Sequence, residues 1–138
     1  MQKEEFRYSD ERFADLQMLR YRLNDFEKLS IKQKKLVYYL SEATLWGRDI
    51  TFDQFGKYNL KIRKTLEAIY TDGAIDHGDK EFAALEEYPM RVWFSNGIYH
   101  HYGCDKFVPG FSKEYFRAAM NAVDRSSLPL ENGMTVDD

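Results

Sequence analysis

The residues best suited to chemistry gather between positions 100 and 105, where His100, His101, Cys104 and Asp105 follow one another closely. On a helix, His100 and Cys104, or His101 and Cys104, would place two zinc ligands on one face. Adjacent helical residues point about 100° apart, however, so the two histidines do not readily share one ion. Neither of the zinc patterns HExxH and CxxC occurs in the chain. We therefore predict no metal site within this chain.

Cys104 and a nearby histidine form the kind of pair that nucleophilic catalysis uses. Such a pair needs two further features, a third group that orients the base and an oxyanion hole that stabilises the intermediate. The spacing of residues indicates neither. No glycine-rich phosphate loop follows an expected strand, which speaks against nucleotide binding by a standard loop. We predict no catalytic residue in this chain.

These residues belong to an aromatic and glycine-rich stretch, positions 93–111, with the sequence WFSNGIYHHYGCDKFVPGF. We predict that Tyr102, Asn96 and Gly103 bind substrate there. Tyr102 offers a flat apolar surface, Asn96 offers an amide, and Gly103 lets a ligand approach the backbone closely. The alternative is that the aromatic residues of this stretch are simply core residues.

Composition narrows the class of protein. The chain has 138 residues, 43% hydrophobic and 31% charged, which is typical of one globular domain. A net charge of -3 provides no basic surface for nucleic acid or an anionic membrane, so neither is an expected partner. No apolar run reaches membrane-spanning length, and the first residues do not resemble a signal peptide. We expect a soluble protein, cytoplasmic or periplasmic, with the compartment left open.

The N-terminal third of the chain is expected to contain one extended segment and one helix. Residues 1–10 are polar, and we expect them to be mobile. Apolar residues then alternate over 13–23, which favours a strand over a helix. Ser30 and Gln33 form a capping box, which predicts a helix with apolar positions at helical spacing from Leu36 to Ile50. Gly47 is expected to loosen this helix and Gly56 to end it or its continuation.

Three more helices are expected in the rest of the chain. The first covers 58–70 and stops at Asp72-Gly73, before a loop over 74–79. The second opens near position 79, is kinked or interrupted by Pro89, and unwinds near Tyr102-Gly103. The third is capped by Ser112 and continues to about position 123.

The fold class predicted from these elements is mainly α. We expect an irregular bundle of four to five helices, with or without one short N-terminal strand. Residues 1–124 are expected to form the helical segment, and residues 125–138, which offer little to bury, a linker or frayed tail.

Two patterns carry a resemblance to a known family. Ser95-Asn96-Gly97, Tyr99, Tyr102-Gly103 and Lys106-Phe107-Val108-Pro109 form a pattern that resembles the N-terminal region of dipeptidyl peptidase III, most closely its Bacteroides-type branch. The segment from Leu36 to Gly47, LVYYLSEATLWG, is similar to the early helix of that family. The resemblance extends from about Phe6 to about Val123.

The resemblance implies a hydrolase. The family consists of zinc-dependent metallopeptidases, exopeptidases that release dipeptides from peptide N-termini, built from two lobes around a wide cleft. This chain is then an N-terminal fragment that supplies part of the cleft wall. Its partners would be the peptide substrate and the remainder of the same polypeptide. The resemblance places Tyr102 at the pocket for the first substrate residues, while the segment 106–109 is structural.

The family holds Zn2+ with an H-E-x-x-G-H motif and a later glutamate in E-E-C-R-A-E or similar, and neither motif occurs in this chain. The resemblance therefore places the zinc ligands outside this chain, and the fragment alone is expected to be inactive. The alternative is a free-standing helical binding or interaction module without catalysis. A third hypothesis is a small metalloprotein that uses His100, His101 and Cys104.

Overall fold

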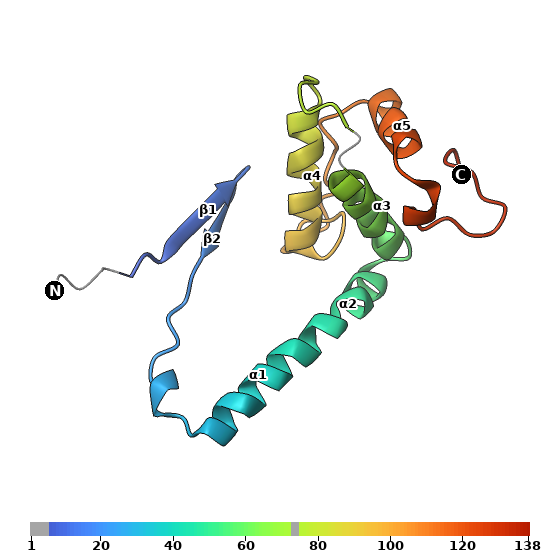
Figure 1. The fold of residues 1–138 in the computed structure, drawn as a ribbon. Coiled ribbons are helices and arrows are strands. Elements are labelled where there is room, and N and C mark those ends of the chain that lie inside the picture. The colour runs from blue at the N-terminus through green and yellow to red at the C-terminus, as the bar shows by residue number, and fades with distance from the viewer. Residues whose placement is uncertain (1–5, 73–74) are drawn as a thin grey trace. The chain divides into compact units, whose positions relative to one another are not determined.

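Helices dominate the part of the chain that the structure describes, as the sequence predicted. The structure is a computed structural model and describes residues 6–72 and 75–138. Five α-helices and one antiparallel strand pair occur in these residues (Figure 1). The backbone divides into two units, Met1–Arg48 and Asp49–Asp138. We call them unit 1 and unit 2.

Unit 1 begins with a β-hairpin instead of the single strand that we predicted. Strand β1 (Ser9–Phe13) pairs with β2 (Leu16–Leu19), and Ala14 takes a left-handed conformation (φ 50°) in the turn between them. The side-chain amide of Gln17 donates to the carbonyl of Asp10 at 3.2 Å, which ties the two strands together. The prediction of mobile residues over 1–10 is therefore wrong for Ser9 and Asp10, while residues 1–5 lie outside the described part of the chain.

The long helix of unit 1 confirms the predicted capping box. Helix α1 (Ile31–Trp46) follows a short 3-10 helix, Phe26–Lys28. The Gln33 amide nitrogen of the backbone donates to Ser30 Oγ at 3.4 Å, and the Ser30 backbone nitrogen donates to Gln33 Oε1 at 2.9 Å. The helix ends at Gly47, its C-terminal cap. Although apolar residues recur along α1, none of its side chains is buried.

Unit 2 contains the hydrophobic core. It is built from α2 (Arg48–Phe55), α3 (Asn59–Asp72), α4 (Phe82–Ser95) and α5 (Lys113–Ala122), and α3 packs against both α4 and α5 (Figure 1). The predicted ends at Gly56 and Asp72 and the predicted cap at Ser112 are confirmed. Gly73 and Ala74, which belong to the predicted stop and loop, lie outside the described residues.

The core of unit 2 consists of two clusters of buried residues. The first joins α3, α4 and α5 with the segment that follows α5, through Ala68, Ile69, Leu85, Ala119, Val123 and Leu128. The second joins α2, α3 and α4 through Phe52, Leu66, Tyr88 and Val92. The sequence predicted the helices α3, α4 and α5, which supply most of these residues.

Helix α4 differs from its prediction in two respects. Pro89 lies inside the helix without interrupting it, and its ring is buried in the core. Burial of the ring compensates for the backbone donor that proline lacks. The helix also ends at Ser95, well before Tyr102-Gly103, because Asn96 takes a left-handed conformation (φ 56°) that stops it.

The segment after α5 packs against the core, whereas we expected a linker or frayed tail over 125–138. Leu128 is buried, and Leu130 and Val136 pack beside it after a short 3-10 helix, Arg125–Ser127. Glu131 Oε1 lies 2.5 Å from Lys61 Nζ on α3. Three apolar residues spaced along an otherwise polar segment are enough to attach it to the helices.

A buried cation connects α2 to α3. Arg63 is only 6% exposed, its Nη2 lies 2.6 Å from Asp49 Oδ1, and its guanidinium lies 4.8 Å from the centre of the Phe52 ring. Glu67 Oε1 lies 3.3 Å from Arg63 Nε, an ion pair without the alignment of a hydrogen bond. Charge pairing and the aromatic face together make burial of the guanidinium tolerable.

The pairing of Asp49 predicts a dependence of stability on pH. The pKa of the Asp49 carboxyl is lowered from its ordinary value of 3.8, first because Lys64 hydrogen-bonds to it and then because Arg63 does. A lowered pKa in the folded state means that this stabilisation is present above the unfolded pKa and is lost as the pH falls through the folded pKa.

We therefore expect Asp49→Asn to be less stable than the parent at about pH 5 and to approach it below about pH 3. Since Asp49 is half exposed, the difference at the higher pH should stay below about 1 kcal/mol. Urea unfolding of both proteins at the two pH values measures it. A difference that is the same at both values would contradict the assignment.

Candidate functional site

The aromatic and glycine-rich stretch folds into a small hairpin after α4. Tyr99 and Lys106 form an antiparallel bridge, and the Phe107 nitrogen donates to the Ile98 carbonyl at 2.8 Å. The His100 nitrogen donates to the Asp105 carbonyl at 2.9 Å. Residues 100–105 therefore form the tip, and we call this segment the hairpin tip.

The base of the hairpin is held by a buried asparagine on α3. Asn59 is 3% exposed, and its Oδ1 accepts a long hydrogen bond of 3.5 Å from the Ile98 nitrogen. A β-carbon placed on Gly97 would lie 2.3 Å from Asn59 Nδ2, closer than atoms can approach. Gly97 thus lets the chain leave α4 in direct contact with α3, which orients the hairpin.

Tyr102 stands at the hairpin tip and is 90% exposed. Its backbone nitrogen donates to His100 Nδ1 at 3.2 Å, and its ring centre lies 4.3 Å from that of His101. The ring of His101 in turn stacks on that of His100 at 4.5 Å. Both histidine rings are tilted relative to the tyrosine ring, and they leave most of the tyrosine exposed.

The three predicted substrate-binding residues do not lie together. Tyr102 and Gly103 are neighbours at the hairpin tip, and Asn96 lies at its base as the cap of α4. A β-carbon on Gly103 would meet no atom closer than 3.9 Å, so the fold itself does not require glycine there.

The residues proposed above as possible metal ligands do not form a metal centre. Cys104 is exposed, and the two histidine rings face each other. Among residues 6–72 and 75–138, no three histidine, cysteine, aspartate or glutamate side chains gather in a way that could hold an ion. His101 Nδ1 instead lies 3.4 Å from Ser95 Oγ.

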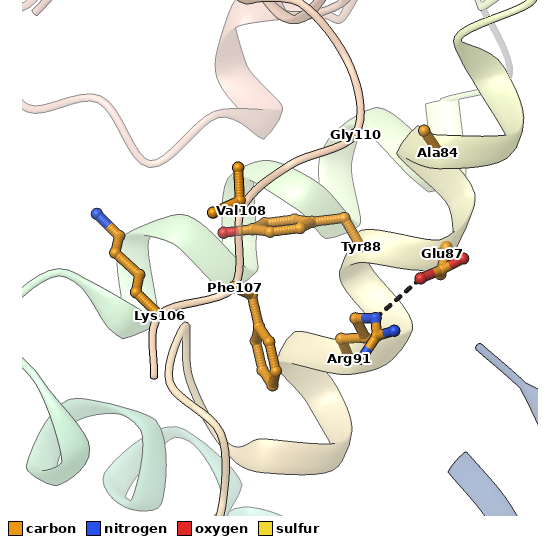
Figure 2. A pocket seen from close by; sticks show the side chains of 8 residues that line it. All are labelled: Ala84, Glu87, Tyr88, Arg91, Lys106, Phe107, Val108 and Gly110. Carbon is orange, nitrogen blue, oxygen red and sulfur yellow. Dashed lines mark hydrogen bonds and ion pairs between the residues drawn. The ribbon is translucent and has the colours of Figure 1, made fainter. Parts of the chain in front are cut away.

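A cavity of about 350 Å³ lies between α4 and the segment 106–110, which leaves the hairpin. On α4 its lining residues recur at helical spacing, on one face of the helix. The segment 106–110 contributes residues on either side of Pro109. The lining consists of Ala84, Glu87, Tyr88 and Arg91 together with Lys106, Phe107, Val108 and Gly110 (Figure 2). None of the three predicted binding residues lines it.

The floor of this cavity is aromatic, and charged groups surround it. Figure 2 shows the Tyr88 ring reaching from α4 toward Val108, with Phe107 beside it. Glu87 Oε1 accepts a hydrogen bond from Arg91 Nε at 2.8 Å, and the Arg91 guanidinium lies 5.7 Å from the Phe107 ring centre. Burial raises the pKa of the Tyr88 hydroxyl, which keeps it neutral.

Sequence reasoning missed this cavity. The segment 106–109 was interpreted as structural, and Glu87 and Arg91 were not singled out. A signal was present, since positions 84, 87, 88 and 91 form one face of a helix that mixes apolar and charged residues. The sequence does not indicate that the segment 106–110 packs opposite that face.

Comparison of the chain with protein-family models and with curated proteins found no match. Within the described residues, every helix is too short or too polar to cross a membrane.

Proposed function

We propose that this chain is the N-terminal part of a zinc-dependent dipeptidyl peptidase III-like exopeptidase, in which the hairpin tip forms part of the wall of the peptide cleft. The observation that carries the proposal is Tyr102, which lies in the segment that resembles the family and is 90% exposed at the end of an ordered hairpin. A large aromatic ring that is exposed to water is available for contact with a ligand.

The surface of α1 gives independent support. Between Leu36 and Trp46 apolar side chains occur on all sides of the helix, and Glu42 is the one charged residue in that range. Tyr39, Leu40 and Trp46 are all exposed. A helix that is apolar on every side is typical of the interior of a larger protein. The remainder of the same polypeptide is the partner that the proposal assigns to it.

The proposal assigns no zinc ligand to this chain. Since neither zinc motif of the family occurs in this sequence, the ligands would lie in the remainder of the polypeptide. The part assigned to Tyr102 is binding: its ring would bury an apolar or aromatic side chain near the substrate N-terminus. Zinc would supply the activation of water in the complete enzyme.

We expect Tyr102→Ala, in the protein encoded by the complete reading frame, to lower kcat/KM for dipeptide release about tenfold, mainly through KM, because an aromatic contact with the substrate is lost. Tyr102→Phe should retain most of the activity. Steady-state kinetics on a peptide with an apolar first residue measures both.

Tyr58→Ala is the matched control, since Tyr58 is an exposed tyrosine on another part of unit 2 and should leave the kinetics unchanged. If Tyr102→Ala has the kinetics of the parent enzyme, Tyr102 does not line the substrate pocket.

The rival hypothesis, a free-standing helical binding module, makes a different prediction about the gene. Under our proposal the reading frame continues beyond position 138 and encodes an H-E-x-x-G-H motif. A stop codon directly after Asp138 would favour the module.

A further inference from the structure

The cavity between α4 and the segment 106–110 has the dimensions of a small-molecule site. Its volume of about 350 Å³ lies at the lower end of the range for ligand pockets, about 300–1,000 Å³. This segment passes so close to α4 that a β-carbon on Gly110 would lie 3.1 Å from that of Ala84. This close approach closes one end of the cavity.

The walls of the cavity are suited to bind the apolar part of a ligand. The Tyr88 ring is largely buried and packs edge-on against Phe111 at 5.7 Å, so it is held in one orientation. Phe107 is held by the hydrogen bond from its backbone nitrogen to the Ile98 carbonyl, and the Arg91 guanidinium lies against its ring. Val108 is exposed beside these rings. A preformed aromatic floor costs little conformational entropy when a ligand binds.

The charges favour a ligand that carries a negative charge. Glu87 and Arg91 neutralise each other across one helical turn, 2.8 Å apart. Lys106 adds a further positive charge, and among residues 6–72 and 75–138 its ammonium has no carboxylate within ion-pair distance. Figure 2 shows Lys106 and Arg91 on opposite sides of Phe107. The lining therefore has a net charge of +1, from one carboxylate and two cations.

We propose that this cavity binds a small carboxylate with an apolar or aromatic body, whose carboxylate pairs with Lys106 and whose body lies on Tyr88 and Phe107. The same chemistry is offered by a free aromatic acid and by the C-terminus of a peptide that ends in an apolar residue. This site is separate from the hairpin tip and does not depend on the function proposed for Tyr102.

Titration of the isotope-labelled chain, followed by proton–nitrogen NMR, tests the proposal with N-acetyl-L-phenylalanine as the probe. We expect shift changes concentrated in residues 84–91 and 106–110. The uncharged N-acetyl-L-phenylalaninamide should bind about fivefold to tenfold more weakly, because it lacks the charge-assisted contact. A third titration with 3-phenylpropionate distinguishes a free acid from a peptide C-terminus as the ligand. If it binds as tightly as N-acetyl-L-phenylalanine, a free acid is sufficient. If it binds more weakly, the site recognises a peptide C-terminus. Both results agree with the proposal.

Substitutions in the cavity lining test the contact between the ligand carboxylate and Lys106. Lys106→Met keeps the aliphatic stem and should reduce binding of the acid to that of the amide, whereas Lys80→Met, an exposed lysine elsewhere in unit 2, should change nothing. Val108→Asp puts a negative charge beside the floor and should abolish binding without disturbing the core, since Val108 is 86% exposed. Equal affinity for acid and amide would overturn the proposal, as would parent-like binding by Lys106→Met or shift changes that avoid both segments.

Discussion

Replacing Phe52 with alanine is expected to lower the free energy of unfolding of unit 2 by about 3–5 kcal/mol. Phe52 is 2% exposed, and it is the residue through which α2 enters the second core cluster. Its ring also forms the surface on which the Arg63 guanidinium rests. The substitution therefore removes apolar burial and exposes one side of a buried cation, two losses that act in the same direction.

Urea unfolding followed by the fluorescence of Trp93 measures this loss, since Trp93 lies in unit 2 and its Nε1 donates to Glu67 Oε1 at 3.1 Å. Phe55→Ala is the matched control, because Phe55 lies on the same helix but is 64% exposed. We expect the control to change the free energy of unfolding by less than about 1 kcal/mol. Equal losses in the two variants would show that α2 is not anchored through Phe52.

Replacing Gly97 with alanine is expected to cost about 2–4 kcal/mol, through a steric clash and backbone strain at one position. The new β-carbon would lie 2.3 Å from Asn59 Nδ2 and 2.8 Å from its Cγ. Asn59 is buried and cannot move aside freely, and Gly97 has a positive φ of 157°. Either the base of the hairpin shifts or α3 does, and both change the position of Tyr102.

A double-mutant cycle separates these causes. Gly97→Ala combined with Asn59→Ala should be less destabilising than the sum of the two single changes, because the shortened side chain makes room. Gly103→Ala, in the same hairpin but with no atom within 3.8 Å of the new carbon, should change the free energy of unfolding by less than about 1 kcal/mol. Additive effects of Gly97→Ala and Asn59→Ala would be inconsistent with the contact that we describe.

The features that the sequence predicted well are those determined by neighbouring residues. The Ser30 and Ser112 caps depend on side chains three residues from the amides that they satisfy, so the pattern alone located both helices. The apolar faces of α3, α4 and α5 follow from helical periodicity. The hairpin of β1 and β2 was missed because its turn, Ala14-Asp15, lacks the glycine or asparagine by which tight turns are usually recognised.

The features that the sequence did not predict depend on contacts between distant segments. The direction in which the chain leaves α4 depends on Asn59, which lies on another helix and contacts Gly97 and Ile98, and nothing in the residues around position 96 indicates that partner. The cavity likewise requires the segment after the hairpin to lie along one face of α4. The tail over 125–138 has few apolar residues, and its composition could not show that Leu128 fills a gap in the core.

One measurement tests the central claim most directly: the products released from a short peptide by the protein of the complete reading frame. Our account predicts that dipeptides leave from the peptide N-terminus, that a zinc chelator stops their release, and that added Zn²⁺ restores it. Intact peptide after long incubation with the zinc-loaded protein, or release of single amino acids instead of dipeptides, would contradict it.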